Sequence, residues 1–298
     1  MACVPINQQE ITSQTTSLYH CVSSSVKKLF SILMISGILT SCGLLGTGGH
    51  KPSIPGKIVF SATDKAGTDQ IFTMNADGSH RKQLTHFPTD GGGGEPAWSP
   101  DGTKIAYDVC LDCERGGGNY EIMTVEVAGE EYDSTQVHRL TNNPASDEAP
   151  SWSPDGKKIV FSSDRDYYTA DTMRWRRDLY MVNADGTDLR RLTRTGNAEL
   201  PKYSSDGTRI AYSWGHDNAV FLYNIESGKI NRYTGIGLGY PLWNKQGNQL
   251  LVFAPKANPP QLELNWISLE NDVPKILKTM TLEGLRVRID NFDWYSDQ

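Results

Sequence analysis

The sequence has no excess of basic residues: 29 lysine and arginine residues stand against 35 aspartate and glutamate residues, and the formal net charge is -6. A protein that binds nucleic acid presents a basic surface to the phosphates, so this balance argues against nucleic acid as a partner. With 38% hydrophobic and 21% charged residues, the composition also argues against a mostly disordered chain.

Long hydrophobic runs are scarce. An apolar run at residues 29–40 follows Lys27 and Lys28 and is too short to cross a bilayer of ~30 Å as a helix. A basic pair, a short apolar run and small residues at its end are typical of a secretory signal peptide. Residues 39–42 read Leu-Thr-Ser-Cys and resemble the lipobox of bacterial lipoproteins, in which the cysteine is lipidated and becomes the mature N-terminus.

We therefore expect residues 1–41 to be a signal peptide that is cleaved between Ser41 and Cys42, with the lipid on Cys42. The glycine-rich segment 42–55 would then be a flexible tether. An ordinary signal or a membrane anchor with a coincidental cysteine is the alternative. The basic pair lies far from Met1 for a signal, so we hypothesise that translation starts near Ser25 or Val26 and that residues 1–25 are not part of the protein.

Cysteines are also few, five in all. After signal removal the chain would keep Cys42, Cys110 and Cys113. In an exported protein, the last two are expected to form a small disulfide, with free thiols and a metal or redox role as alternatives. The six histidines show no paired spacing, and a zinc site would need two further ligands. We expect no metal and no cofactor.

One pattern of Pro-x-aromatic followed by a turn and an apolar strand recurs along the chain. Three copies occupy residues 96–107, 150–161 and 201–212, and a decayed copy occupies residues 241–252. Each copy is typical of a β-hairpin, because proline presets φ and glycine accepts positive φ in the turn, where the aspartate can bond backbone N–H groups. The residues to which we assign this structural role are Trp98, Asp101, Gly102, Trp152, Asp155, Gly156, Asp206 and Gly207.

Each repeat predicts a four-stranded antiparallel unit of propeller-blade size. First strands at positions 98, 152, 203, 243 and 294 and second strands at positions 58, 105, 159, 210 and 250 both number five. The strand near Trp294 would complete the first blade, whose own first strand is missing upstream, and closing the ring protects sheet edges. We predict an all-β fold at residues 56–298, a five-bladed propeller closed by the C-terminal strand, with six blades as the alternative.

The Trp-Ser-Pro-Asp-Gly turn with its following Lys-Ile-Val-Phe strand, as at residues 152–161, resembles the TolB-type, WD-like propeller repeat. The resemblance covers residues 56–298 and implies the fold much more strongly than it implies a function. TolB propellers have six blades and an N-terminal α/β domain. About fourteen residues separate Cys42 from the first strand, so we expect that domain to be absent and the protein to be TolB-like, not TolB itself. The repeat also precedes the hydrolase domain of prolyl-oligopeptidase-type enzymes, but the sequence has no Gly-x-Ser-x-Gly elbow.

Carboxylates precede three of the first strands, at Glu95, Glu148 and Glu199. If the aromatic strand is innermost, as the resemblance implies, these side chains would lie at equivalent repeat positions around one mouth of the central channel. Their focused field would favour a cation or a basic peptide segment. The alternative is that each one caps backbone N–H groups where its strand begins.

The longest insertion between a second and a third strand, residues 163–177, mixes aromatic and arginine side chains. Such residues dominate protein-interaction hot spots, so we predict a contact loop, with a self-packed surface loop as the alternative. The candidate contact residues are Tyr167, Tyr168, Arg174, Trp175 and Arg176.

Together these features predict a non-catalytic, monomeric lipoprotein of the bacterial cell envelope that binds a protein or peptide partner. Its lipid would hold it to the membrane on the periplasmic side of the outer membrane or on another extracytoplasmic membrane surface. The alternative function is a glycan-binding or glycan-cleaving propeller that uses the channel carboxylates.

Overall fold

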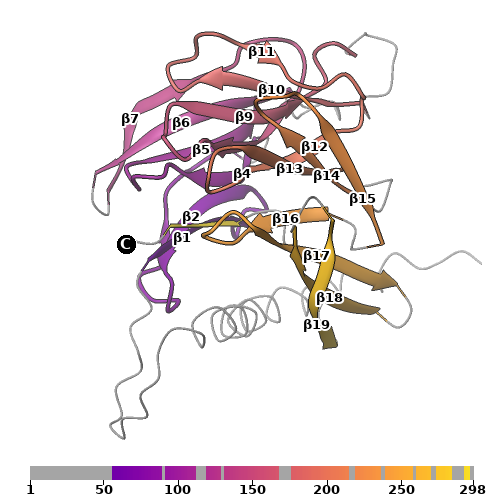
Figure 1. Ribbon diagram of the computed structural model, residues 1–298. Helices are drawn as coiled ribbons and strands as arrows, with labels where there is room; N and C mark the ends of the chain where they lie inside the picture. Colours follow the sequence, from indigo (N-terminus) through magenta and orange to yellow (C-terminus); the bar gives the residue numbers. More distant parts are fainter. Residues whose placement is uncertain are drawn as a thin grey trace, which may run out of the picture. The chain divides into compact units, whose positions relative to one another are not determined.

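In the computed structural model of this chain, the residues described below form five four-stranded antiparallel sheets, arranged as the blades of a β-propeller (Figure 1). The structure describes residues 56–88, 91–111, 119–128, 131–167, 176–214, 219–235, 239–257, 260–269, 273–283 and 292–295. The five-blade prediction is confirmed. No helix within these ranges is long and apolar enough to cross a membrane.

The strands follow the repeat along the chain. Blade 1 contains β20 (Phe292–Tyr295), β1 (Lys57–Thr63), β2 (Asp69–Asn75) and β3 (Lys82–Gln83). Blade 2 contains β4 (Gly92–Trp98), β5 (Lys104–Cys110), β6 (Tyr120–Ala128) and β7 (Glu131–Arg139). Blade 3 contains β8 (Asp147–Trp152), β9 (Lys158–Ser163), β10 (Asp178–Asn183) and β11 (Arg190–Arg191).

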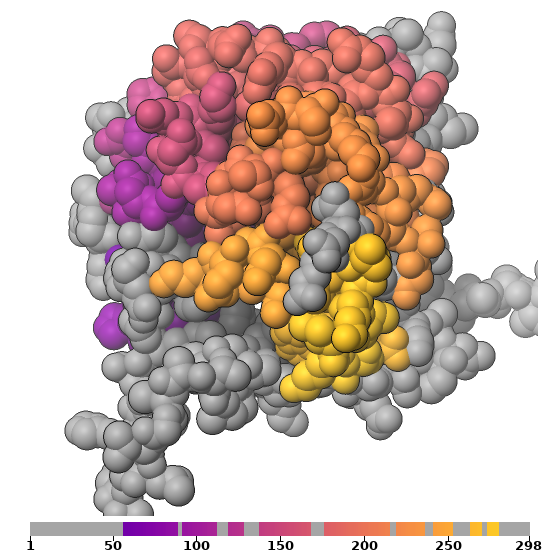
Figure 2. Space-filling view, in the orientation of Figure 1, coloured from indigo at the N-terminus to yellow at the C-terminus, as the bar shows by residue number. Residues whose placement is uncertain are grey.

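The last two blades have the same order. Blade 4 contains β12 (Glu199–Tyr203), β13 (Arg209–Trp214), β14 (Ala219–Asn224) and β15 (Ile230–Thr234). Blade 5 contains β16 (Gly239–Trp243), β17 (Gln249–Ala257), β18 (Pro260–Ser268) and β19 (Lys275–Glu283). β19 is the outermost strand of its sheet and forms part of the yellow surface in Figure 2.

The predicted ring closure is present in blade 1, where the C-terminal strand β20 pairs antiparallel with β1. Ile58 lies opposite Trp294 in this register, and Ile58 and Val59 are both buried. The first strands of the blades contact one another in sequence: β20 with β4, β4 with β8, β8 with β12, and β12 with β16. They therefore form the inner layer of the propeller.

The Ser-x-Asp-Gly turns have one shared hydrogen-bond pattern. Asp101 Oδ1 accepts from the Ser99 hydroxyl at 2.6 Å and from the Thr103 N–H at 3.0 Å. Asp155 and Asp206 bond their own turns in the same way. Glycine follows each aspartate because the backbone there has φ near +70°, a region that disfavours a Cβ.

Among the residues that the structure describes, the buried hydrophobic side chains form four clusters between the blades. Each cluster of buried residues draws side chains from two successive blades, as where Ile105 and Tyr107 of blade 2 pack with Val59 and Ile71 of blade 1. The other three clusters join blade 2 to 3, 3 to 4 and 4 to 5 in the same way. Trp152 adds a direct bond across one of these interfaces, from its indole N–H to the carbonyl of Ala97 at 3.2 Å.

A register shift interrupts the pairing of the first and second strands in blades 2 to 5. In blades 2 to 4 the residue at this bulge has positive φ and immediately precedes the repeat's proline: Glu95 at 44°, Ala149 at 58° and Leu200 at 54°. Positive φ is uncommon for residues other than glycine and is strained. The bulge re-aims the side chains beside it.

Candidate functional site

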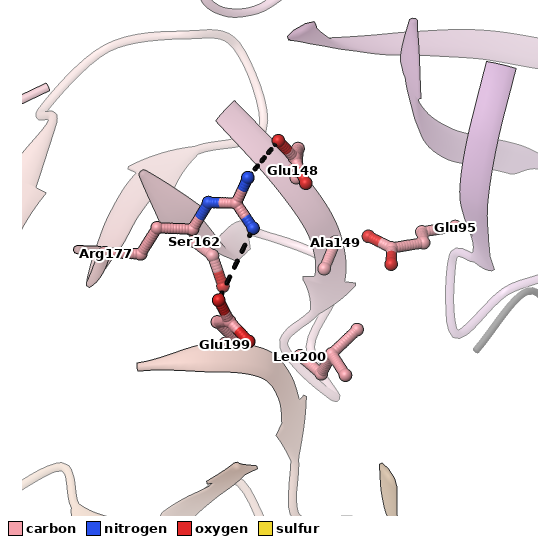
Figure 3. A pocket seen from close by; sticks show the side chains of 7 residues that line it. All are labelled: Glu95, Glu148, Ala149, Ser162, Arg177, Glu199 and Leu200. Carbon is pink, nitrogen blue, oxygen red and sulfur yellow. Dashed lines mark hydrogen bonds and ion pairs between the residues drawn. The ribbon is translucent and has the colours of Figure 1, made fainter. Parts of the chain in front are cut away.

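A small pocket lies where the inner strands of blades 2, 3 and 4 begin (Figure 3). Its volume is about 160 Å³. The lining residues are Glu95, Glu148, Ala149, Ser162, Arg177, Glu199 and Leu200. The three glutamates predicted to share a channel mouth do therefore line one pocket.

The three glutamates do not occupy equivalent positions, and this part of the sequence interpretation is wrong. Glu148 lies opposite Ser162 and Glu199 lies opposite Ser213, whereas the residue at this register in blade 2 is Gly94, opposite Asp108. Glu95 is one residue further on, in the strained bulge position. Counting back from the prolines would have revealed the offset, because Glu148 and Glu199 stand two residues before a proline and Glu95 stands one residue before.

Arg177 holds the two equivalent glutamates together. Its guanidinium lies 2.5 Å from Glu148 Oε1 and 3.6 Å from Glu199 Oε1, and Figure 3 shows both contacts. About a fifth of each side chain is exposed, 21% for Arg177 and 19% for Glu148, so solvent screens the ion pairs only partly. Arg177 is the last residue before β10, and its role was not predicted because only the fold brings it to the glutamates.

Asp108 of β5 lies behind Glu95 and is 2% exposed. Burial raises the pKa of the Asp108 carboxyl, and hydrogen bonds from the Ala149 N–H and with the Glu95 side chain partly oppose that rise in pKa. The Ala149 N–H lies 3.0 Å from Asp108 Oδ2. Two carboxyl groups that bond each other share a proton. Blade 2 thus supplies two acidic groups to the pocket region, Glu95 and Asp108. Blades 3 and 4 supply one each, Glu148 and Glu199, at the strand position that Gly94 occupies in blade 2.

The buried carboxyl group of Asp108 leaves no room for a side chain at position 94. A Cβ at position 94 would lie 2.8 Å from Asp108 Oδ1. We expect Gly94→Ala to lower the free energy of unfolding by about 1–3 kcal/mol, the range for overpacking a filled site. Denaturant titration would measure it, with the double variant Gly94→Ala/Asp108→Ser as a control, because serine stands opposite the glutamates of blades 3 and 4. Equal destabilisation in the single and double variants would contradict this explanation.

Burial also shifts the titration of Glu148 and Tyr120. The pKa of Glu148 rises from 4.5 to about 7, because desolvation of the carboxylate outweighs its attraction to Arg177, and Asp108 adds repulsion. Desolvation raises the pKa of the Tyr120 hydroxyl too, and the negative charge of Asp108 adds to that rise. Acidic groups are thus crowded around the pocket.

The described ends of the predicted contact loop are attached to blade 3. The Tyr167 hydroxyl donates to Asp178 Oδ2 at 2.8 Å, and the guanidinium of Arg176 lies 4.5 Å from the centre of the Tyr167 ring. Arg191 of β11 forms ion pairs with Asp166 of the loop and with Asp178 of β10. Tyr167 and Arg176 therefore pack locally, while Tyr168, Arg174 and Trp175 lie outside the described residues.

Several other predicted residues are less informative. Cys110 is 4% exposed and disulfide-bonded, while its expected partner Cys113 lies outside the described residues. Ser41, Cys42 and the tether lie outside them as well. In the part of the chain that is described, no group of three or more His, Cys, Asp or Glu side chains is placed to hold a metal ion.

Comparison with known proteins gives partial matches. No protein-family model matches the chain. An uncharacterized protein of Agrobacterium fabrum is 31% identical over 150 residues, which are 48% of this chain and 46% of the relative. The Tol-Pal system protein TolB of Francisella tularensis subsp. mediasiatica is 28% identical over 124 residues, 42% of this chain and 25% of the relative.

The fold agrees with these matches. The crystal structure of TolB from Acinetobacter baumannii superposes with a TM-score of 0.59 at 20% identity, covering 77% of this chain and 54% of that one. These comparisons show that the chain has a β-propeller fold, here with five blades, and that part of its sequence is similar to TolB. Its matches span less than half the length of the two curated relatives.

Proposed function

We propose that this chain is a non-catalytic propeller of the bacterial cell envelope that binds a protein or peptide partner at the pocket formed by Glu95, Glu148 and Glu199. The observation that carries the proposal is the convergence of these acidic side chains from three blades on one small space. Rigid blades hold the pocket, and loops on a rigid scaffold commonly carry binding function. Similarity to TolB, which is named for the Tol-Pal system, supports an envelope location.

Three further parts of the proposal concern residues outside the described ranges or the state of the whole protein. Lipidation at Cys42 after cleavage behind Ser41 would anchor the propeller to a membrane, with residues 42–55 as the tether. The outer part of the loop, with Tyr168, Arg174 and Trp175, would enlarge the contact surface. The protein would act as a monomer.

Capture of the partner tests the proposal. We expect the full-length protein, crosslinked in its native envelope membranes, to retain a specific partner, and the variant Glu95→Gln/Glu148→Gln/Glu199→Gln to retain at least about tenfold less, since about 1.4 kcal/mol of lost binding energy is tenfold in affinity. Glu226→Gln is the matched control, because Glu226 is an exposed glutamate in the β14–β15 turn. Thermal melting of each variant separates lost binding from lost folding. Equal capture by the triple variant would contradict the proposal.

The glycan-cleaving alternative requires an acid and an opposing ionised carboxylate. The raised pKa of Glu148 suits an acid. Glu199, the glutamate at the equivalent position of blade 4, forms an ion pair with the same Arg177 as Glu148 does. The two carboxylates therefore share one cation and do not stand as an independent acid and ionised carboxylate. We expect no sugar release when the purified protein is screened on cell-wall and plant polysaccharides, and sugar release that Glu148→Gln abolishes would replace the binding proposal.

A further inference from the structure

We propose that the pocket recognises a primary ammonium group on an alkyl stem, the group that a lysine side chain carries, between Glu95, Ser162 and Glu199. The inference rests on the proposed function, because it names the chemical group that the partner would insert. Four observations carry it: the local charge, an unsatisfied hydroxyl, the directions from which the acceptors come, and the volume.

The local charge calls for a cation. Of the described residues that line the pocket, Arg177 is the only positively charged one, and it already bridges Glu148 and Glu199. Glu95 points into the pocket from the side opposite Arg177 (Figure 3). The buried carboxyl group of Asp108 is hydrogen-bonded to the Glu95 side chain. Even with one proton shared between Glu95 and Asp108, the carboxylates outnumber the guanidinium, and a second cation would offset the excess.

The buried hydroxyl group of Ser162 also favours a ligand that donates hydrogen bonds. Ser162 is 1% exposed, and its Oγ has no hydrogen-bond partner among the described residues. It lies in the pocket wall, and in Figure 3 its side chain is directed toward Glu199. A buried hydroxyl without a partner costs free energy, so this position favours a ligand that donates a hydrogen bond to it.

The arrangement of acceptors favours ammonium over guanidinium. Glu95 belongs to β4, Ser162 to β9 and Glu199 to β12, so the acceptors approach from three different blades. An ammonium group has three N–H donors that can serve three separate acceptors, whereas a guanidinium is planar and suits bidentate carboxylates. Carboxylate oxygens can each accept more than one hydrogen bond, so Glu199 can serve Arg177 and a ligand together.

The volume limits the size of the ligand. A pocket of about 160 Å³ has room for several water molecules, each of which occupies about 30 Å³ in the liquid. That space fits an ammonium group and the end of its alkyl stem, with the rest of the ligand outside.

Titration calorimetry on the full-length protein tests the inference with blocked pentapeptides in which glycines flank one central residue. We expect the lysine peptide to bind about tenfold more tightly than the arginine peptide or the Nε-acetyl-lysine peptide, because only the first provides an ammonium group. Ionic strength is held constant throughout. Equal affinity for the lysine and acetyl-lysine peptides, or no measurable binding of any peptide, overturns the inference.

Ser162→Ala separates binding from folding. We expect this variant to bind the lysine peptide about tenfold more weakly, with a melting temperature that is unchanged or higher, because the buried hydroxyl has no described partner to lose. Glu199→Gln should weaken binding as well, and the exposed-site variant Glu226→Gln should leave it unchanged. Undiminished binding to both Ser162→Ala and Glu199→Gln places the ligand elsewhere and overturns the inference.

The source of the ammonium group is tested with 1,5-diaminopentane. If the lysine peptide binds more tightly than the diamine, the result supports a protein or peptide partner. Tight binding of the diamine alone supports ammonium recognition but assigns the site to a free amine, which contradicts the proposed function. Failure of every amine probe, with envelope capture still dependent on the three glutamates, overturns only this inference and leaves the proposed function standing.

Discussion

Replacing Arg177 with methionine is expected to lower the free energy of unfolding by about 3–5 kcal/mol, the cost of removing one partner from a buried ion pair. The arginine faces both Glu148 and Glu199, and its loss leaves two largely buried carboxylates without a described cation beside them. Chemical denaturation at pH 8 measures the loss. Because a fifth of each side chain is exposed, the effect should fall toward the lower end of this range.

The matched control is the variant Arg177→Met/Glu148→Gln/Glu199→Gln. It removes the cation and both negative charges together, so most of the lost stability should return. If this triple variant is no more stable than Arg177→Met alone, the arginine contributes through packing of its stem and the electrostatic explanation fails.

The same residues predict how stability depends on pH. Glu148 has a pKa of about 7 in the folded protein against an ordinary value of 4.5, so the folded state binds its proton more tightly than the unfolded chain does. The contribution of this group to stability is therefore complete below pH 4.5 and is lost as the pH rises through 7. In Arg177→Met the loss of the cation raises the pKa of Glu148 further, so the variant should be destabilised less at pH 5.5 than at pH 8. An equal effect at both pH values would exclude Glu148 ionisation as the cause.

The affinity for the lysine peptide should rise with pH, whereas the contribution of Glu148 to stability falls with pH. A lysine ammonium, with an ordinary pKa near 10.4, stays charged throughout this range. Ionisation of Glu148 therefore strengthens the attraction as pH rises from 6 to 8, while the intrinsic stability contribution of Glu148 falls. Calorimetry with the lysine peptide at both pH values would detect this opposite trend.

Removing the C-terminal strand is expected to have the second large effect. Truncation of residues 292–298 takes away one of the two strands that pair with β1 and is expected to uncover Ile58 and Val59, which are 1% and 0% exposed. Four register pairs are lost, from Lys57 with Tyr295 to Phe60 with Phe292. At about 1 kcal/mol for each net hydrogen bond and about 1.5–3 kcal/mol for each uncovered side chain, the loss amounts to several kcal/mol.

Differential scanning calorimetry measures this effect as a large fall in melting temperature. The control ends at Tyr295, which removes residues 296–298 and keeps the whole of β20. An open blade also exposes the edge of β1, so the longer truncation should aggregate more readily on heating. If both truncated chains melt at the same temperature, ring closure through β20 does not stabilise the propeller.

The repeat made much of the fold predictable from sequence. Trp98, Trp152 and Tyr203 end first strands as expected, and the turn after each one returns the chain into a buried second strand. These turns are encoded locally, because aspartate bonds groups two residues away and glycine accepts the backbone angle that the turn requires. Blade 5 was predicted less completely, since β18 and β19 carry no recognisable copy of the later repeat elements.

The site was predictable only in part. Glu95, Glu148 and Glu199 were identified from their places before the first strands, and they do line one pocket. Arg177, Asp108 and Ser162 were missed because their importance depends on partners from other strands. Asp108 follows the second-strand motif at a place where the next two blades have serine, and this difference was the available signal.

The sequence by itself determined the five repeats, their turns, the closing strand and an acidic region before the first strands, because each depends on residues close together in the chain or on a repeated pattern. Only the tertiary structure decided how the acidic groups are used. Burial raises the pKa of Glu148, a bulge re-aims Glu95, and blade packing brings Arg177 between two glutamates. The physical reason is that charge interactions depend on distance and solvent exposure, and neither is set until the blades pack.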